Sequence, residues 1–346
     1  MNILIRTDSS KFIGSGHLMR CLTLAYRYRK EGHRVIFICR NMAGNLSGLV
    51  QKSGFELVKL STEETRSELR GYAKWLTVTQ EQDAAETIEI VKTLGKVDRL
   101  VVDSYAIDIT WEKLLRPYVG KIMVIDDLAN RQHDCDILLD QNFYLNMESR
   151  YQGFVPEHCQ LLLGPKYALL REEFYQVRKS MRVRDGQLRN ILVFYGGVDA
   201  TNETSKAIQA LQNLRDTSAL HDVQVTVVVG ASNERKETVA YHCKQAGFRY
   251  LCQVSNMAEL MAEADLMLGA GGSTTWERCF LGLPAIVTAI AENQVQICED
   301  CAEEELIFYL GYWDKVLQED ICKAINKLMV PSQLLSIQRQ MSQLMG

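Results

Sequence analysis

The chain has 346 residues, of which 47% are hydrophobic and 24% are charged, and its formal net charge at pH 7 is −4. This length suggests two domains that each bury a core, and the composition is ordinary for a globular protein. The slight acidity and the lack of a basic block argue against binding to nucleic acid or to an anionic membrane surface. No apolar run reaches the roughly 18 residues that a membrane span needs. The ten cysteines form no framework, which indicates the reduced thiols of a cytoplasmic protein.

Short apolar runs alternate with longer helical patterns along the chain. In the first half the runs are NILIRTD (2–8), RVIFICR (34–40), RLVVDS (99–104) and KIMVIDD (121–127), and helices are expected near 16–31 and 43–53. The second half repeats the theme with NILVFYGG (190–197), VQVTVVVG (223–230), ADLMLGAGG (264–272) and LPAIVTA (283–289). Buried runs separated by helices indicate parallel sheets with helices on both faces.

The polar, basic stretch 176–190 separates the two halves and is interpreted as a linker. The segment from Pro331 predicts a last amphipathic helix. We therefore expect two Rossmann-like α/β domains, at residues 1–178 and 188–330, with helix 332–346 joining the first. The carboxyl ends of both parallel sheets are expected to face an interdomain cleft, where ligands of such sheets bind.

Three glycine-rich turns follow predicted strands and precede helices, which favours a phosphorylated ligand. They are Gly14-Ser15-Gly16, Gly196-Gly197 and Gly269-Ala270-Gly271-Gly272. The first turn has Met19 where the dinucleotide fingerprint has its third glycine, and no P-loop motif occurs. Dehydrogenase and ATPase functions are therefore disfavoured.

Two titratable residues lie in the helices predicted to follow these turns. His17 opens a helix, and histidine is the side chain whose ordinary pKa suits a base near neutral pH; the alternative is a histidine that only packs or caps the turn. Asp8, Asp103 and Asp126 each end a strand and could orient its ring. Glu277 could accept hydrogen bonds from a ribose diol, or could be a solvated helix acid beside Arg278.

Two further patterns are interpreted as structural. Cys298 and Cys301 form a Cys-x-x-Cys spacing without a second ligand pair, so we read them as ordinary helical thiols. Asp134 and Asp136 resemble a metal motif, but an apolar strand-like run follows them directly.

The sequence resembles the PseG/SpsG family over nearly its whole length. The similar stretches are RTDSSKFIGSGHLMRC (6–21), VVDSYAID (101–108), VIDDLANRQHDCDILLDQN (124–142), GPKYALLREEF (164–174) and YGGVD (195–199). GAGGSTTWERCFLGLPAI (269–286), followed by ENQ (292–294), is also similar to the nucleotide-sugar half of GT-B enzymes, especially the N-acetylglucosaminyltransferase of peptidoglycan assembly.

The resemblance implies a GT-B fold that hydrolyses a UDP-linked 2,4-diacetamido-2,4,6-trideoxy hexose to UDP and free sugar in pseudaminic acid biosynthesis. Water would attack C1 with inversion, without a metal or a cofactor, and the UDP-sugar is the only partner expected. The alternatives are a GT-B glycosyltransferase that uses a UDP-amino-sugar donor and a nucleotide-sugar-binding protein without turnover.

The resemblance also assigns roles to individual residues. His17 matches the family's catalytic histidine, and Tyr105 and Asn293 match two of its polar site residues. By analogy with the transferase, Glu277 would hold the ribose, and the backbone near Val254 and Met257 the uracil. The turns are expected to face the diphosphate or the sugar, and the full substrate-binding set is Asp8, Gly14, Gly16, Tyr105, Gly196, Gly197, Val254, Met257, Gly271, Gly272, Ser273, Thr274, Glu277, Asn293 and Gln294. Trp75 and Trp276 are interpreted as packing residues, and Arg171 as a structural residue at the start of a helix.

Overall fold

A computed structural model describes residues 1–62, 69–217, 219–272 and 274–345. Its contacts divide the chain into two compact units, which we describe separately. The first unit consists of Met1–Asn142 and Asn146–Leu169, and the second of Phe143–Leu145 and Leu170–Gly346. Within the described ranges, no helix has both the length and the apolarity that crossing a bilayer requires.

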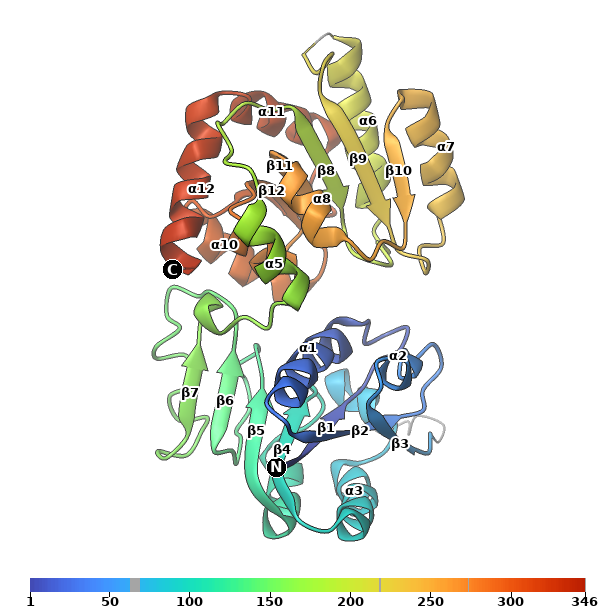
Figure 1. Ribbon diagram of the computed structural model, residues 1–346, viewed down its shortest axis with the longest axis vertical. Coiled ribbons are helices and arrows are strands. Elements are labelled where there is room, and N and C mark those ends of the chain that lie inside the picture. Colours follow the sequence, from blue (N-terminus) through green and yellow to red (C-terminus); the bar gives the residue numbers. More distant parts are fainter. Residues whose placement is uncertain (63–68, 218, 273, 346) are drawn as a thin grey trace. The chain divides into compact units, whose positions relative to one another are not determined.

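The first unit is a seven-stranded, fully parallel sheet with helices on both faces (Figure 1). Its strand order is β3-β2-β1-β4-β5-β6-β7. The elements are β1 (Asn2–Thr7), α1 (Gly16–Lys30), β2 (Arg34–Arg40), α2 (Gly48–Lys52), β3 (Glu56–Leu60), η1 (Gly71–Leu76), α3 (Gln80–Leu94), β4 (Val97–Asp103), α4 (Ile109–Leu115), η2 (Arg116–Tyr118), β5 (Val119–Ile125), β6 (Ile137–Asp140), β7 (Gln160–Leu163) and η3 (Pro165–Tyr167).

Alternating strand residues supply two separate cores. Leu4 and Ile36 point to the face covered by α3 and α4, whereas Ile3 and Phe37 point to the face covered by α1 and α2. Strands buried on both faces become continuous apolar runs, as the sequence shows. The helix expected near 43–53 is confirmed only as the shorter α2, because Gly44 adopts a φ of 71° and breaks the helical path.

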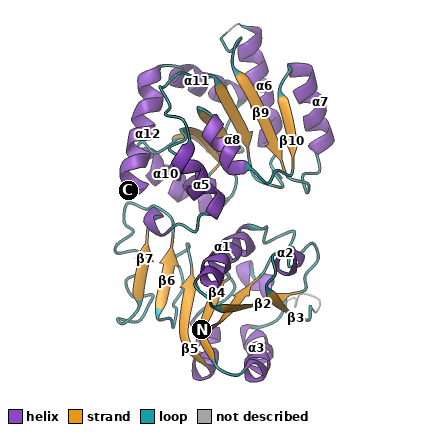
Figure 2. Cartoon of the chain, in the orientation of Figure 1, coloured by secondary structure: helices purple, strands orange, loops and turns teal. Residues whose placement is uncertain are grey.

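The second unit is a six-stranded, fully parallel sheet with the order β10-β9-β8-β11-β12-β13, again flanked by helices (Figure 2). Its elements are α5 (Glu172–Ser180), β8 (Asn190–Phe194), α6 (Glu203–Asp216), β9 (Gln224–Val229), α7 (Lys236–Ala246), β10 (Arg249–Cys252), α8 (Met257–Glu263), β11 (Leu266–Ala270), α9 (Thr274–Phe280), β12 (Ala285–Ala289), η4 (Glu292–Gln294), α10 (Val295–Glu303), β13 (Phe308–Tyr312), α11 (Gln318–Leu328) and α12 (Pro331–Met345).

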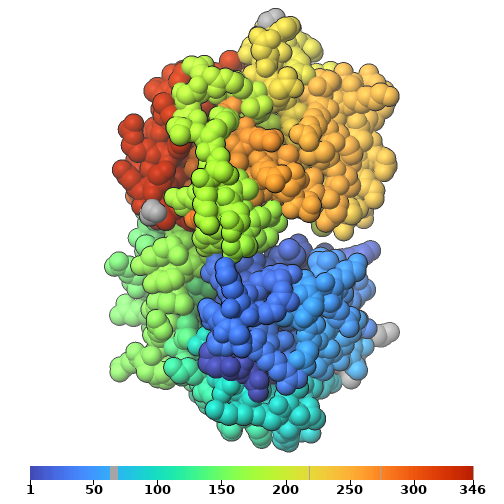
Figure 3. Space-filling view, in the orientation of Figure 1, coloured from blue at the N-terminus to red at the C-terminus, as the bar shows by residue number. Residues whose placement is uncertain are grey.

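The stretch 176–190 and the last helix differ from the expected domain assignment. The division comes after Leu169, and the segment that follows it lies along the second unit (Figure 3). Helix α12 also groups with the second unit, because it packs on α9 and α11. Gly186 fits so closely against α12 that a Cβ there would lie 2.7 Å from Pro331 O.

Arg184 explains why this basic stretch is part of a core. Its guanidinium is buried and donates to Met261 O at 2.7 Å and Ala264 O at 2.7 Å, at the end of α8. It also donates to Leu281 O at 2.6 Å and Gly282 O at 3.2 Å, just after α9. The last carbonyls of a helix lack intrahelical donors and carry partial negative charge. One cation therefore clamps the ends of two helices.

The strand orders create one topological switch point in each sheet. In the first unit, the strand that follows β1 (β2) and the strand that follows β4 (β5) lie on opposite sides of the neighbouring pair β1 and β4. In the second unit, β9 and β12 lie on opposite sides of β8 and β11 in the same way. Open parallel sheets bind ligands at the carboxyl ends of such strands. The loops that follow these four strands are therefore where functional residues are expected.

Replacing Arg184 tests the clamp. We expect Arg184→Met to lower the free energy of unfolding by about 3 kcal/mol, because the buried carbonyls lose charged donors. Arg189→Met is the matched control: Arg189 is 55% exposed and pairs with Asp185, so its loss should leave the free energy of unfolding nearly unchanged. Urea unfolding followed by circular dichroism measures both. Equal stability of the two variants would contradict the clamp.

Candidate functional site

His17 lies at the switch point of the first sheet, against a buried carboxylate. It is the second residue of α1 and is 7% exposed. Asp103 ends β4, beside Thr7 at the end of β1, and is fully buried. His17 Nδ1 lies 2.6 Å from Asp103 Oδ1. The adjacent strand ends thus bring together two residues that are far apart in the sequence.

Arg20 completes this cluster from the next turn of α1. Its Nε and one terminal nitrogen each donate to Asp103 at 2.6 Å, and the other terminal nitrogen donates to Asp127 at 2.9 Å. Burial by itself would raise the pKa of Asp103, but attraction to Arg20 and then to His17 outweighs burial and holds that pKa well below its usual range. Asp103 is therefore ionised at neutral pH.

The sequence offered three aspartates that could orient the imidazole, and Asp103 is the one that contacts it. Asp8 instead accepts from Arg40 N at 2.6 Å and pairs with Arg6 at 2.7 Å. Asp126 pairs with Arg131 at 2.7 Å and accepts from the Tyr151 hydroxyl at 3.1 Å.

The hydrogen bond to the ionised carboxylate of Asp103 fixes the tautomer of the His17 ring. The neutral imidazole that donates Nδ1–H to Asp103 keeps its lone pair on Nε2. Such a nitrogen can accept a proton from water, and the resulting imidazolium would be stabilised by the carboxylate behind it. The geometry of His17 is therefore that expected of a base, and the position of Asp103 is that expected of the group that orients it.

Three aromatic rings, Tyr72, Trp75 and Tyr105, stand beside His17 and are called here the aromatic wall. Tyr105 packs edge-on against the imidazole at 4.6 Å between ring centroids, and Trp75 does so at 5.7 Å. Trp75 stacks on Tyr105 at 5.3 Å, and Tyr72 contacts both rings. Tyr105 is buried and Tyr72 is 38% exposed. The wall therefore extends from the buried imidazole to the surface of the unit.

The wall contains a residue that the sequence assigned to packing. Trp75 does pack against the core, but it also contacts His17. The 3₁₀ helix η1, which carries Trp75, ends at Thr77 with a φ of 64°. A left-handed conformation is costly for a β-branched residue, and such strain gathers near functional sites. The only sequence signal was the spacing of two aromatic residues in GYAKWL.

The first glycine turn leaves open space beside His17. A Cβ added at Gly14 or Gly16 would meet no heavy atom within 4 Å, and Gly14 has a φ of 79°. Packing therefore does not explain the absence of side chains here. Both residues remain candidates for contact with a ligand.

In the second unit, the other two glycine turns follow β8 and β11, which are hydrogen-bonded neighbours. Gly196 has a φ of 96°, and neither it nor Gly197 has a neighbour that would obstruct a Cβ. Gly271 differs, because a Cβ there would lie 2.3 Å from Cys298 Sγ. Gly271 is thus required for packing, whereas the turn at Gly196 and Gly197 has room for a ligand.

Glu277 is not the solvated acid that one interpretation of the sequence expected. Its side chain is only 12% exposed, and Arg171 Nε donates to its Oε1 at 2.9 Å. Arg171 also pairs with Glu173 at 2.6 Å. Arg278 turns inward and donates to Ala270 O at 3.2 Å. Burial raises the pKa of Glu277, an effect that Arg171 opposes.

The remaining predicted residues of this unit lie in or near the first turns of helices. Gln294, in η4, accepts from Ile290 N at 3.0 Å and lies next to Gly271 and Gly272, whereas Asn293 is exposed. Thr274 begins α9. Met257 begins α8 and is buried, and Val254 is half-buried in the loop before it. Ser273 lies outside the described residues.

The acidic pair Asp134 and Asp136 and the Cys-x-x-Cys pair both belong to the packed structure. Asp134 and Asp136 both bind the Arg116 guanidinium, at 3.1 and 2.5 Å, which is the structural role expected. Cys298 and Cys301 are buried, free thiols of α10.

The dependence of the unfolding free energy on pH, measured under acidic conditions, tests whether Asp103 is ionised in the folded protein. The pKa of Asp103 is depressed in the folded state, so its stabilisation is present above about pH 4 and is lost as the pH falls toward the folded pKa. We expect Asp103→Asn to be about 3 kcal/mol less stable at neutral pH, because Arg20 loses its main partner. Its unfolding free energy should also fall less steeply below pH 4, by up to about 1.4 kcal/mol per pH unit.

Urea titrations between pH 5 and pH 3 measure this slope. Asp222→Asn is the control, because the Asp222 side chain is 97% exposed, and it should keep the slope of the parent protein. Parallel profiles for Asp103→Asn and the parent would contradict the assignment.

Comparison with known proteins gives the same fold and adds a family. Residues 190–343 match the glycosyltransferase family 28 C-terminal domain. The crystal structure of MurG from Acinetobacter baumannii superposes with a TM-score of 0.68 and 15% identity, over 99% of this chain and 94% of MurG. The two parallel α/β sheets therefore form a GT-B fold.

Three relatives align over much of the sequence. The chain is 30% identical to the UDP-2,4-diacetamido-2,4,6-trideoxy-β-L-altropyranose hydrolase of Campylobacter jejuni, over 85% of this chain and 93% of that protein. It is 27% identical to the uncharacterised protein MJ1062 of Methanocaldococcus jannaschii over 88% of this chain, and 24% identical to the spore coat polysaccharide biosynthesis protein SpsG of Bacillus subtilis over 61%. It spans only 58% of the archaeal protein and 60% of SpsG. With the Campylobacter hydrolase as a relative over nearly its full length, the chain belongs to the PseG/SpsG family of GT-B proteins.

Proposed function

We propose that this protein hydrolyses a UDP-linked 2,4-diacetamido-2,4,6-trideoxy hexose to UDP and the free sugar, as part of pseudaminic acid biosynthesis. The observation that carries the proposal is the 2.6 Å contact between His17 and a buried, ionised Asp103. The name of the Campylobacter relative supports the choice of sugar. A glycosyltransferase remains the second candidate, because the matched domain model describes glycosyltransferases.

In the proposed reaction, Nε2 of His17 accepts a proton from water while the water oxygen attacks C1 of the sugar. The bond between C1 and the diphosphate oxygen breaks, and UDP leaves with the electron pair. Asp103 holds the imidazole in the required tautomer and stabilises the imidazolium. A single displacement inverts the configuration at C1.

The second unit would bind the leaving group. The turn at Gly196 and Gly197 offers unobstructed backbone to the diphosphate. Gly272, Ser273 and Thr274 precede or begin α9 and would contribute to the same role. Glu277 would accept the ribose hydroxyls while Arg171 holds its carboxylate in place. The backbone near Val254 and Met257 would contact uracil, and Asn293 and Gln294 the sugar.

Incubation with the UDP-sugar alone, in the presence of EDTA, tests the reaction. We expect steady release of UDP and free sugar, and a loss of about 10²–10⁴-fold in rate in His17→Ala. His221→Ala is the control, because His221 is 79% exposed. Release only after an acceptor is added would indicate a glycosyltransferase, and binding without release would indicate a nucleotide-sugar-binding protein without turnover.

The configuration of the product tests the single displacement. The first sugar formed, observed by NMR before mutarotation, should have the inverted configuration at C1, and retention of configuration would exclude a single displacement.

The aromatic wall is proposed to contact the apolar groups of the sugar, its acetamido methyls and its 6-deoxy carbon. We expect Trp75→Ala to lower kcat/KM for the UDP-sugar about 10–200-fold, and Trp75→Phe to recover most of the loss. Inhibition by UDP should be unchanged in both variants, because UDP lacks the sugar. Tyr241→Ala, at a 61% exposed tyrosine of the second unit, is the control. Equal weakening of UDP inhibition would contradict a role in sugar recognition.

A further inference from the structure

Two thiols of the first unit meet at the start of neighbouring strands. Cys135 precedes β6 and Cys159 precedes β7, and their Sγ atoms lie 3.5 Å apart. The backbones are already joined here, because Gln160 N donates to Asp136 O at 2.9 Å. Adjacent strands lie about 4.8 Å apart, so residues at such positions fall near the roughly 4.4–6.8 Å Cα separation that a disulfide accepts. Closing the bond would need only local movement.

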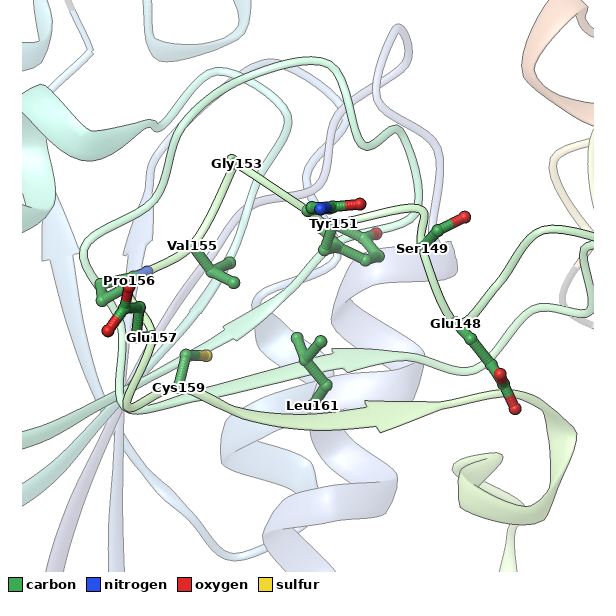
Figure 4. Close-up of a pocket in the computed structure, with 10 residues that line it drawn as sticks. Glu148, Ser149, Tyr151, Gly153, Val155, Pro156, Glu157, Cys159 and Leu161 are labelled. Carbon is green, nitrogen blue, oxygen red and sulfur yellow. The ribbon is translucent and has the colours of Figure 1, made fainter.

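The two thiols differ in access. Cys135 is fully buried in the core beneath α3 and α4. Cys159 is half-buried and lines a cavity of about 460 Å³. Figure 4 shows Cys159 among the residues that line this cavity, with the side chains of Val155 and Leu161 near it. A small reagent that enters the cavity would therefore meet Cys159 first.

The pair also differs in acidity. The hydrogen bond with Cys135 lowers the pKa of the Cys159 thiol, and the same bond, followed by burial, raises the pKa of Cys135. A thiolate is the reactive form of cysteine, and exposed thiolates with a nearby second thiol are preferentially oxidised. Access assigns Cys159 as the attacking group and Cys135 as the resolving group, and the directions of the two pKa shifts agree with this assignment.

We propose that Cys135 and Cys159 are a redox modification site at which hydrogen peroxide converts two thiols into a disulfide. The Cys159 thiolate attacks one peroxide oxygen, the O–O bond breaks, and hydroxide leaves and takes up a proton, giving a sulfenic acid. The Cys135 sulfur then attacks the Cys159 sulfur, the S–O bond breaks, and water leaves with the thiol proton. The two cysteines lose two electrons in total, and the peroxide is reduced to two molecules of water.

The test uses the full chain after reduction and removal of the reductant. The protein is treated with hydrogen peroxide at neutral pH, free thiols are blocked with N-ethylmaleimide, and peptides are mapped by mass spectrometry without reduction. We expect a cross-linked peptide pair that lacks two hydrogen atoms, and at least a tenfold loss of N-ethylmaleimide labelling at Cys159. Dithiothreitol should restore the labelling. Oxidation of Cys159 without a link to Cys135, or unchanged labelling, would overturn the proposal.

Single variants assign the order of the steps. Cys135→Ser should stop at a sulfenic acid on Cys159 that dimedone traps, and Cys159→Ser should leave Cys135 unoxidised. Cys252→Ser is the control, because Cys252 is an exposed cysteine of the second unit, and it should retain the cross-link. The result with the unmutated protein decides the proposal even where a variant folds poorly. Oxidation of Cys135 in Cys159→Ser at the original rate would contradict the assigned order.

Discussion

The buried carboxylate of Asp103 is the constraint on which the first-unit site depends. A carboxylate without solvent is costly unless it is paired and hydrogen-bonded. One face of α1 supplies these partners: His17 and Arg20 bind its oxygens at 2.6 Å, and Cys21 Sγ lies 3.4 Å away. Residues three and four apart share a helix face. The need to satisfy one acid therefore fixes how α1 meets the end of β4, and with it the direction of the imidazole.

In the second unit, buried arginines bind backbone carbonyls and so hold the ends of two helices and the two sides of one glycine turn. Arg184 clamps the ends of α8 and α9. Arg278, which is fully buried, donates to Ala270 O and Thr275 Oγ1 on either side of the third glycine turn. Burial lowers the pKa of both guanidinium groups, that of Arg184 to about 10. Both arginines stabilise the positions of loop and helix ends.

The sequence predicted the features that follow from local patterns of residues. It missed the features that depend on contacts between residues far apart in the sequence. Buried apolar runs predicted both parallel sheets, and the resemblance marked His17. Nothing local could choose Asp103 over Asp8 or Asp126, because that choice depends on which strand lies beside β1. Trp75 was assigned to packing, because a 3₁₀ helix of six residues is too short to give a periodic signal. The stretch 176–190 was interpreted as a linker, because a basic run is usually solvated. In the structure, Arg184 is buried and donates to the carbonyls of residues about 80 to 100 positions later in the sequence.

The glycines of the three turns are required for different physical reasons. Gly271 is required by packing, since a side chain there would collide with Cys298. Gly14 and Gly196 have left-handed backbone conformations, and a Cβ at Gly14, Gly16 or Gly196 would meet no neighbour. Only glycines of this second kind leave room for a ligand beside the backbone. A glycine motif therefore supports a binding site through the neighbours that its missing Cβ would meet, and by that criterion the turns after β1 and β8 have a stronger claim than the turn after β11.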